Sequence, residues 1–109
     1  MDVTAAQKLQ SNGISVDESA LRELAQRYQI QKISVFGSSL HGQIAPNSDV
    51  DLLVSFHTDA LVSLFDLMDL EAELTELFGR KVDVVEPQSL TNPVRRRSIL
   101  SSAEPLYAA

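Results

Sequence analysis

Residues 35–56 read VFGSSLHGQIAPNSDVDLLVSF, and this stretch decides the fold. The apolar run that ends at Gly37 predicts a short β-strand over residues 30–36. The run after Asp49 predicts a second strand over residues 50–56, with two carboxylates at its start. Glycine, serine, asparagine and proline dominate the segment between the two runs, which is typical of a turn. The stretch therefore predicts a strand, a tight connection and a second strand.

The connection and the carboxylates have the chemistry of a nucleotide site. Gly37 with Ser38 or Ser39 can bring backbone amides and a hydroxyl close to phosphate oxygens, because glycine has no side chain in the way. Asp49 and Asp51 point to the same face of a strand, with Cα atoms roughly 6.6 Å apart. At that distance both carboxylates can hold one divalent ion or a pair of ions. The stretch therefore predicts a site for a nucleoside triphosphate and magnesium.

The spacing Gly-Ser-x10-Asp-x-Asp resembles the signature of the DNA polymerase beta-like nucleotidyltransferases. With its Ala-Pro-Asn-Ser lead-in and its Asp-x-Asp-Leu-Leu-Val strand, the chain is similar to their small, single-domain branch, the minimal nucleotidyltransferase (MNT) domain family. The similarity extends, more weakly, from about Leu21 to Tyr107. One departure is Leu40-His41-Gly42, where the family commonly has Ala-Arg-Gly, so one expected phosphate or partner contact is missing.

The resemblance implies a fold, an activity and a partner. Members of this branch are typically antitoxins paired with a HEPN-domain toxin. The implied reaction is magnesium-dependent transfer of AMP from ATP to a hydroxyl, a tyrosine of the toxin, which silences it. Asp49, Asp51 and Asp83 would ligate two magnesium ions, and Asp83 would help deprotonate the acceptor. The Gly-Ser-Ser turn at residues 37–39 would hold the outgoing pyrophosphate.

Two other functions stay open on the sequence. The chain can be a binding module that neutralises its partner by complex formation, with an unused nucleotide site. The missing arginine and a broad apolar helix favour this alternative. Transfer to a small-molecule hydroxyl, such as that of an aminoglycoside, is disfavoured because such transferases usually carry an additional domain. The nucleotide base, the acceptor and the oligomeric state, homo- or hetero-oligomer, are not determined by the sequence.

The length and composition are those of one domain. The chain has 109 residues, of which 44% are hydrophobic, enough for a modest core. We expect a single domain over residues 1–109, with an N-terminal segment at 1–14 that is either frayed or a short helix. A C-terminal helix and tail occupy residues 91–109. The expected fold class is α/β (α+β), a small mixed sheet with helices packed on it.

The charge and the rarer residues exclude several classes of function. A net charge of −6 leaves no general electrostatic footprint for long nucleic acid. The chain has no cysteine and two histidines, which excludes a disulfide scaffold and a Cys-based zinc site. No stretch is apolar and long enough to cross a bilayer, and the N-terminus lacks a signal-peptide pattern. We therefore expect a cytoplasmic protein without a membrane partner.

Apolar periodicity predicts two main helices. Ser15-x-x-Glu18 has the form of a capping box, which predicts a helix over residues 16–29. A long helix is expected over residues 60–78, ended by Gly79. Its polar side is acidic, and its apolar surface is wider than one core contact needs. Packing on the sheet with a solvated acidic face is sufficient to explain this pattern, and contact with a partner protein is the alternative. Four residues form its expected core face: Leu64, Leu67, Leu74 and Phe78.

The C-terminal third predicts one more strand and one more helix. In a strand over residues 81–85, alternation places Asp83 with Val85 on one face. The resemblance implies that this strand lies beside the second strand. Asn92 followed by proline predicts a helix from residue 93 to about 102. The three arginines at 95–97 fan around its first turn, so they cannot all serve one site.

Overall fold

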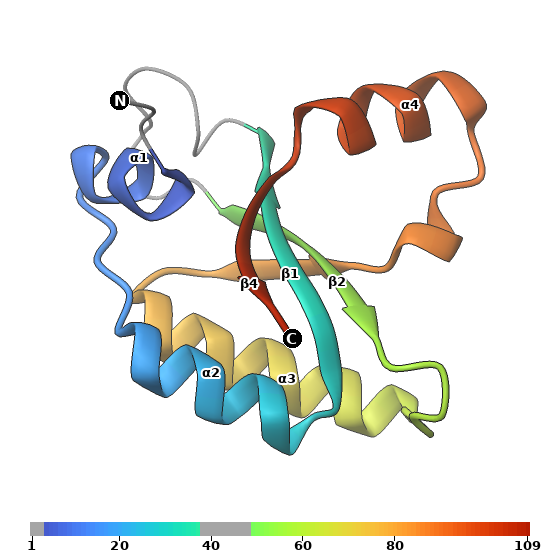
Figure 1. Ribbon diagram of the computed structural model, residues 1–109, viewed down its shortest axis with the longest axis horizontal. Helices are drawn as coiled ribbons and strands as arrows, with labels where there is room; N and C mark the ends of the chain where they lie inside the picture. Colours follow the sequence, from blue (N-terminus) through green and yellow to red (C-terminus); the bar gives the residue numbers. More distant parts are fainter. Residues whose placement is uncertain (1–3, 38–48) are drawn as a thin grey trace.

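The computed structural model describes residues 4–37 and 49–109 (Figure 1). In the described residues the helices are α1 (Ala5–Ser11), α2 (Glu18–Arg27), α3 (Leu64–Phe78), α4 (Pro93–Ser102) and a short 3₁₀ helix, η2 (Pro87–Ser89). The strands are β1 (Ile30–Phe36), β2 (Val50–Phe56), β3 (Val82–Val85) and β4 (Glu104–Ala108).

The strands form a mixed sheet in the order β3-β2-β1-β4. The central strand β1 is antiparallel to both β2 and β4, and β2 is parallel to β3. A parallel pair needs a crossover connection, and α3 supplies it between β2 and β3. The expected α/β class, a small mixed sheet with helices packed on it, is confirmed.

The two faces of the sheet carry different layers. Ile33, Val35 and Leu52 point to one face and join the main core, to which α1, α2 and α3 contribute. On this face α2 and α3 lie side by side (Figure 1), bridged by Arg27 and Glu73. The opposite face carries a smaller apolar cluster with α4: Phe36, Leu53, Leu90 and Ile99. Strand alternation therefore puts Asp51, two residues before Leu53, on the α4 face.

Helix α3 begins later than the sequence predicts. Ser63 caps it in a capping box, in which the Ser63 hydroxyl accepts from the Asp66 amide at 3.1 Å and the Asp66 carboxylate accepts from the Ser63 amide at 3.0 Å. The expected core face is also partly wrong, because Leu70 is buried and Leu64 is 71% exposed. Leu64 lies six residues before Leu70, roughly 120° away around a 3.6-residue helix. The first turn of α3 therefore presents apolar side chains to solvent.

Helix α2 is shorter than predicted at both ends. It begins at Glu18, and its cap is Asp17, whose carboxylate accepts a 3.1 Å hydrogen bond from the backbone N–H three residues on. The predicted capping box at Ser15 is therefore wrong. The helix ends at Arg27, and Gln29 has a positive φ of 57°, which turns the chain into β1.

The N-terminal and C-terminal elements contact each other. Residues 5–11 form a short helix, the alternative to a frayed segment, and Leu9 is fully buried. Strand β4, which the sequence did not predict, pairs with the outer side of β1. Lys8 joins the two elements, because its ammonium lies 2.8 and 2.9 Å from the carboxylate oxygens of Glu104. No helix in the described ranges has the length and apolar character to span a membrane.

Helix α3 also covers the free edge of β3. The Val82 amide donates to the Thr75 hydroxyl, and the Val84 amide donates to the Glu71 carboxylate, both at 3.0 Å. An uncovered edge strand is a template for pairing with other chains. These two side chains therefore satisfy the edge of the strand that carries Asp83.

Candidate active site

Three carboxylates meet at the start of the parallel strand pair. Asp51 and Asp83 are register partners on β2 and β3, so their side chains point to the same face. Asp49 comes two residues before Asp51, and the adjacent Val50 amide donates to the Lys81 carbonyl at 2.8 Å. The structure therefore brings together the three acidic residues that the sequence singled out.

The pKa shifts of these carboxylates show that they interact. Burial raises the pKa of Asp51, and the negative charges of Asp83 and Asp49 raise it further. Burial also raises the pKa of Asp83, and Asp49 adds to the rise through a hydrogen bond and through its charge. Like charges this close favour protonation or a cation between them. The cluster therefore has the electrostatic character of a cation-binding site.

Gly37 closes against one of these carboxylates. Its φ of +83° lies in the left-handed region, and a Cβ at this position would lie 2.7 Å from Oδ2 of Asp51. A side chain here would push the Asp51 carboxylate away, so the close approach explains why the position needs glycine. The end of β1 is thus placed directly beside the acidic cluster. The predicted phosphate-binding residues Ser38 and Ser39 lie outside the described residues, as does His41.

Two basic side chains act on the acidic cluster. Lys81 Nζ lies 3.9 Å from Oδ2 of Asp49. Arg95 lowers the pKa of Asp51, against the other causes of its shift. Its neighbour Arg96 instead donates to the carbonyl of Pro87 in η2. Among the three consecutive arginines, Arg95 is therefore the one whose charge acts on the pKa of Asp51.

No pattern in the sequence distinguishes Arg95 from its two arginine neighbours. The spacing of Arg95 from Ile99 does distinguish it, but only once the packing of α4 on the sheet is known. Ile99 is buried against Phe36 and Leu53 on the sheet face that carries Asp51. Arg95 precedes Ile99 by four residues, so both lie on the same side of the helix. The buried Ile99, one turn further on, therefore places residue 95 on the side of α4 that faces the sheet.

The three carboxylates have the chemistry that a hard divalent cation needs, but by themselves they do not make a complete metal site. Within residues 4–37 and 49–109, no group of three His, Cys, Asp or Glu side chains is arranged so that it could hold a metal ion. Magnesium usually takes one or two carboxylates, keeps several waters and uses substrate phosphates as further ligands, rather than a cage of protein ligands. All the candidate ligands here are carboxylate oxygens, so the cluster fits a metal that arrives with a phosphorylated substrate.

A family model described as "Nucleotidyltransferase domain" matches residues 18–106 of the chain. The matched range contains every residue of the acidic cluster and the Gly37 turn.

Among curated proteins, the chain is similar to the protein adenylyltransferase MntA of Thermococcus cleftensis. The two are 37% identical over 75 residues, which cover 69% of this chain and 74% of the relative. Among solved structures, a provisionally described minimal nucleotidyltransferase superposes with a TM-score of 0.67 at 35% identity, covering 82% of this chain and 88% of that one.

A third similarity is in fold. The MNT antitoxin complex with the tri-AMPylated HEPN toxin of Shewanella oneidensis contains a chain that matches with a TM-score of 0.59 at 22% identity. The match covers 93% of this chain and 73% of that one.

Proposed function

The chain belongs to the nucleotidyltransferase domain family, and from this premise we propose that it transfers AMP from ATP to a tyrosine hydroxyl of a HEPN toxin. In doing so it acts as the antitoxin. The observation that carries the proposal is the in-register pair of Asp51 and Asp83, with Asp49 beside them and Gly37 packed against Asp51. The name of the Thermococcus relative supports AMP transfer to a protein, and the Shewanella complex supports a HEPN toxin as acceptor.

The proposed reaction exchanges the phosphoanhydride bond between the α- and β-phosphates of ATP for a phosphoester bond to the acceptor. The acceptor oxygen forms a bond to the α-phosphorus of ATP, the bond from that phosphorus to the bridging oxygen breaks, and pyrophosphate leaves with the electron pair. The acceptor proton passes to Asp83. Bound magnesium would neutralise charge on the attacking and leaving oxygens. Asp49, Asp51 and Asp83 would hold it.

The remaining residues position the substrate. Arg95 offers a guanidinium on the same side as Asp51, where the triphosphate would lie, and arginine pairs with phosphate oxygens through two parallel hydrogen bonds. The absence of a side chain at Gly37 lets the Asp51 carboxylate lie against the end of β1, beside the turn that would meet the phosphates. The hydroxyls of Ser38 and Ser39 would bind the leaving pyrophosphate. Most of the rate enhancement would come from positioning and from charge stabilisation.

The test is to incubate the protein with ATP, magnesium and a HEPN toxin and to weigh the toxin by mass spectrometry. The expected result is a gain of one or more AMP units with the wild type. The matched variant Asp49→Asn/Asp51→Asn keeps the side-chain volumes and should give no gain, with an unchanged circular dichroism spectrum. An unmodified toxin after incubation with the wild type would overturn the enzymatic proposal.

A second candidate function is neutralisation by binding alone. The exposed apolar side chains at the start of α3 favour it, because they offer a protein-binding surface that does not include the carboxylates. The same Asp49→Asn/Asp51→Asn variant separates the two functions. If it still rescues the growth of cells that express the toxin, complex formation is sufficient; if rescue is lost, AMP transfer is needed.

A further inference from the structure

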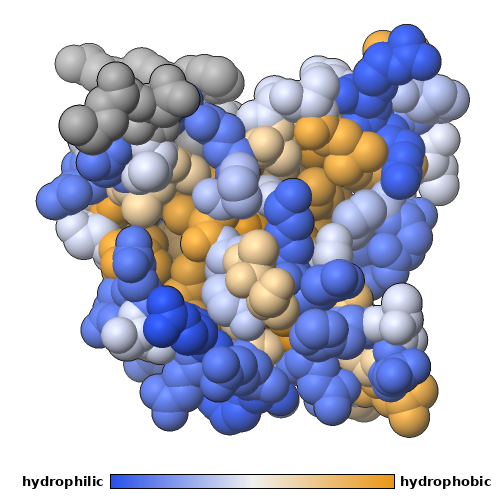
Figure 2. All heavy atoms as spheres, viewed as in Figure 1, coloured by the Kyte–Doolittle hydropathy of each residue, from blue (hydrophilic) through white to orange (hydrophobic). Residues whose placement is uncertain are grey.

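The segment before α3 and the first turns of α3 carry a group of large apolar side chains that nothing in the described chain covers. Their exposed fractions are 96% for Leu61, 71% for Leu64, 77% for Phe65 and 60% for Met68. We call these four residues the α3 patch. Figure 2 shows hydrophobic surface at the corner where α3 begins. Single exposed apolar residues are ordinary, but neighbouring ones on one helix end mark an interaction site.

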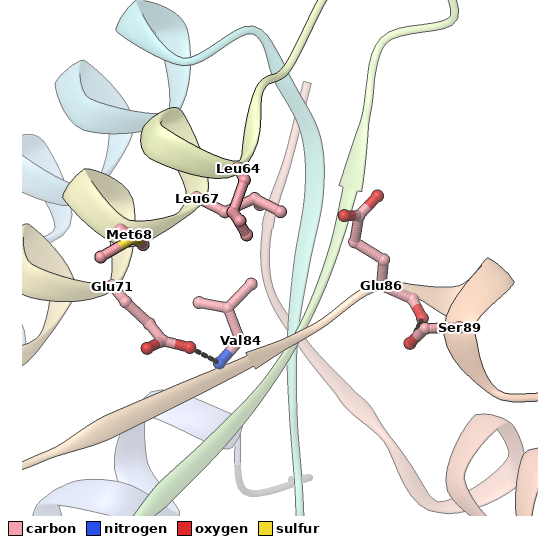
Figure 3. A pocket seen from close by; sticks show the side chains of 7 residues that line it. All are labelled: Leu64, Leu67, Met68, Glu71, Val84, Glu86 and Ser89. Carbon is pink, nitrogen blue, oxygen red and sulfur yellow. Dashed lines mark hydrogen bonds between the residues drawn. The ribbon is translucent and has the colours of Figure 1, made fainter.

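A groove continues the α3 patch toward β3. It has a volume of about 350 Å³, and Leu64, Leu67 and Met68 line its helix side. Val84 lines the strand side, and its side chain points across the groove toward Leu64 (Figure 3). Glu71 lies at the floor, where its carboxylate accepts from the Val84 amide. The groove therefore has apolar walls that could receive the side chains of a bound segment.

The charge that lines the groove is of one sign, with Arg96 of α4 nearby as a donor to the Pro87 carbonyl. Glu71 and Glu86 are the charged residues that line the groove. Arg27 of α2 is paired with Glu73 of α3 at 2.9 Å. All the charged residues of α3 are acidic: Asp66, Asp69, Glu71, Glu73 and Glu76.

This charge selects the kind of partner. In a two-fold dimer the same surface meets itself, so a second copy would bring acidic residues against acidic residues. A partner with an apolar stripe flanked by lysine and arginine would instead match both the apolar walls and the two acidic residues that line the groove. Amphipathic helices are recognised in this way, through apolar anchors one helical turn apart.

We propose that the α3 patch and its groove bind a basic amphipathic helix of the partner protein. The proposal rests on the proposed function, because it assigns a surface to the partner whose hydroxyl is modified. Asp83 and Val84 are neighbours on β3 and point to opposite faces of the sheet. A helix in the groove would thus hold the partner beside the strand that carries the acidic cluster, without covering the cluster.

The test is a titration of ¹⁵N-labelled protein with synthetic helical peptides, followed by amide chemical shifts. Two peptides share one leucine stripe and differ in carrying lysine or glutamate on the polar side, and a third is a scrambled lysine peptide. The expected result is that the first peptide shifts amides of residues 61–71 and 84–89 and that the other two do not. Equal shifts with the scrambled peptide, or shifts confined to the acidic cluster, would overturn the proposal.

A matched pair of variants identifies the surface. Leu64→Gln/Phe65→Gln/Met68→Gln replaces three exposed apolar side chains by polar ones, and it should weaken binding by about tenfold or more. Val94→Gln alters a position on α4 that is 80% exposed, and it should bind like the wild type. Equal weakening of peptide binding in both variants would contradict the assignment. A wild-type dimer in light scattering that becomes a monomer in the triple variant would also contradict it, because the surface would then bind a second copy.

The peptide experiment needs neither ATP nor the acidic cluster. Failure of the peptide to bind would therefore leave AMP transfer standing as a proposal. Conversely, an Asp49→Asn/Asp51→Asn variant that transfers no AMP should still bind the lysine peptide.

Discussion

At the scale of single residues, Gly37 constrains the site more than its size suggests. Its backbone takes a left-handed conformation, and the space of its missing side chain is filled by the Asp51 carboxylate. Gly13 has nearly the same φ, +81°, yet a Cβ there would meet nothing within 4 Å. The two glycines therefore separate the cost of backbone strain from the cost of displacing a carboxylate.

We predict that Gly37→Ala and Gly13→Ala each lose about 1–2 kcal/mol of unfolding free energy through left-handed strain. Only Gly37→Ala should also abolish transferase activity, because it moves Asp51. Urea unfolding and the AMP-transfer assay measure the two effects. If both variants keep full activity, the contact between Gly37 and Asp51 has no functional role.

The acidic cluster makes stability depend on pH. Folding raises the pKa of Asp51 and of Asp83, so the folded state holds these protons more tightly than the unfolded chain does. For an acid with a raised pKa, ionisation costs stability. The cost is absent below the ordinary carboxyl pKa near 4 and grows as the pH rises through the raised values.

In metal-free buffer, Asp83→Asn should therefore raise the free energy of unfolding at pH 7 by about 0.5–2 kcal/mol, the usual gain when a functional compromise is removed. The difference from the wild type should shrink as the pH is lowered toward 4. Denaturant titrations across this range provide the measurement. A difference that is constant with pH, or a less stable variant at pH 7, would show that repulsion among the carboxylates is not its source.

Arg95 and Arg97 offer a comparison within one helix. The charge of Arg95 lowers the pKa of Asp51. Arg97 lies two residues further along α4, so it points to another side of the helix. Arg95→Ala should reduce kcat/KM for ATP. The expected loss of transition-state stabilisation is about 1.5–3 kcal/mol, the value of a charge-assisted hydrogen bond. Arg97→Ala should change it little. Steady-state kinetics of both variants check this, and equal losses would mean that the arginines act through general charge.

At the scale of elements, α3 connects the core, the edge of β3 and the exposed patch. Its buried side packs on the sheet through Leu70, Leu74 and Phe78. Glu71, one position after Leu70, points its carboxylate at the Val84 amide on the strand edge. The N-terminal turns leave the α3 patch exposed. One helix thus fixes the strand that carries Asp83 and offers a surface to a partner.

The contact between Glu71 and Val84 can be tested by a pair of substitutions. Glu71→Ala leaves the Val84 amide without its acceptor and should cost about 1–3 kcal/mol of unfolding free energy. Glu71→Gln keeps an acceptor oxygen at the same length and should cost clearly less. Chemical denaturation of the two variants gives the comparison. Equal losses would assign the effect to charge or packing rather than to the edge hydrogen bond.

At the scale of the whole molecule, the two ends of the described chain contact the same edge of the sheet. Strand β4 pairs with β1, and α1 contacts β4. Strand β4 pairs with β1 from Lys32 to Val35, and the Ala109 amide donates to the Gln31 carbonyl at 2.8 Å. Helix α1 adds the ion pair between Lys8 and Glu104, whose partly exposed groups make it worth at most about 1 kcal/mol. Strand pairing and the packing of Leu106 and Tyr107 on the main core are therefore the stronger ties.

Removal of residues 104–109 should therefore unfold the domain or lower its melting temperature severely, because β1 loses a strand neighbour and the core loses two side chains. Removal of Ala109 alone breaks one backbone hydrogen bond and should have a small effect. Thermal unfolding by circular dichroism compares the two truncations. A stable, cooperative domain without β4 would show that the strand is not part of the folding unit.

The sequence by itself determined the centre of the fold. The apolar pattern of residues 30–36 and 50–56 predicted both strands. It also predicted the shared face of Asp49 and Asp51, because successive side chains of a strand point to opposite faces of the sheet. Asn92 and Pro93 likewise fixed the start of α4, since capping is local. The later start of α3 was also readable, from Ser63-x-x-Asp66, and was missed because the apolar residues before it extend the periodic pattern.

The tertiary structure alone decided which distant residues meet. It paired β4 with β1, set Asp83 in register with Asp51, chose Arg95 among three arginines and left the α3 patch exposed. Each of these depends on contacts between segments far apart in the chain, and such contacts leave no periodic signal in either segment. A local pattern fixes which way a side chain points, whereas its neighbours are fixed by how the layers pack.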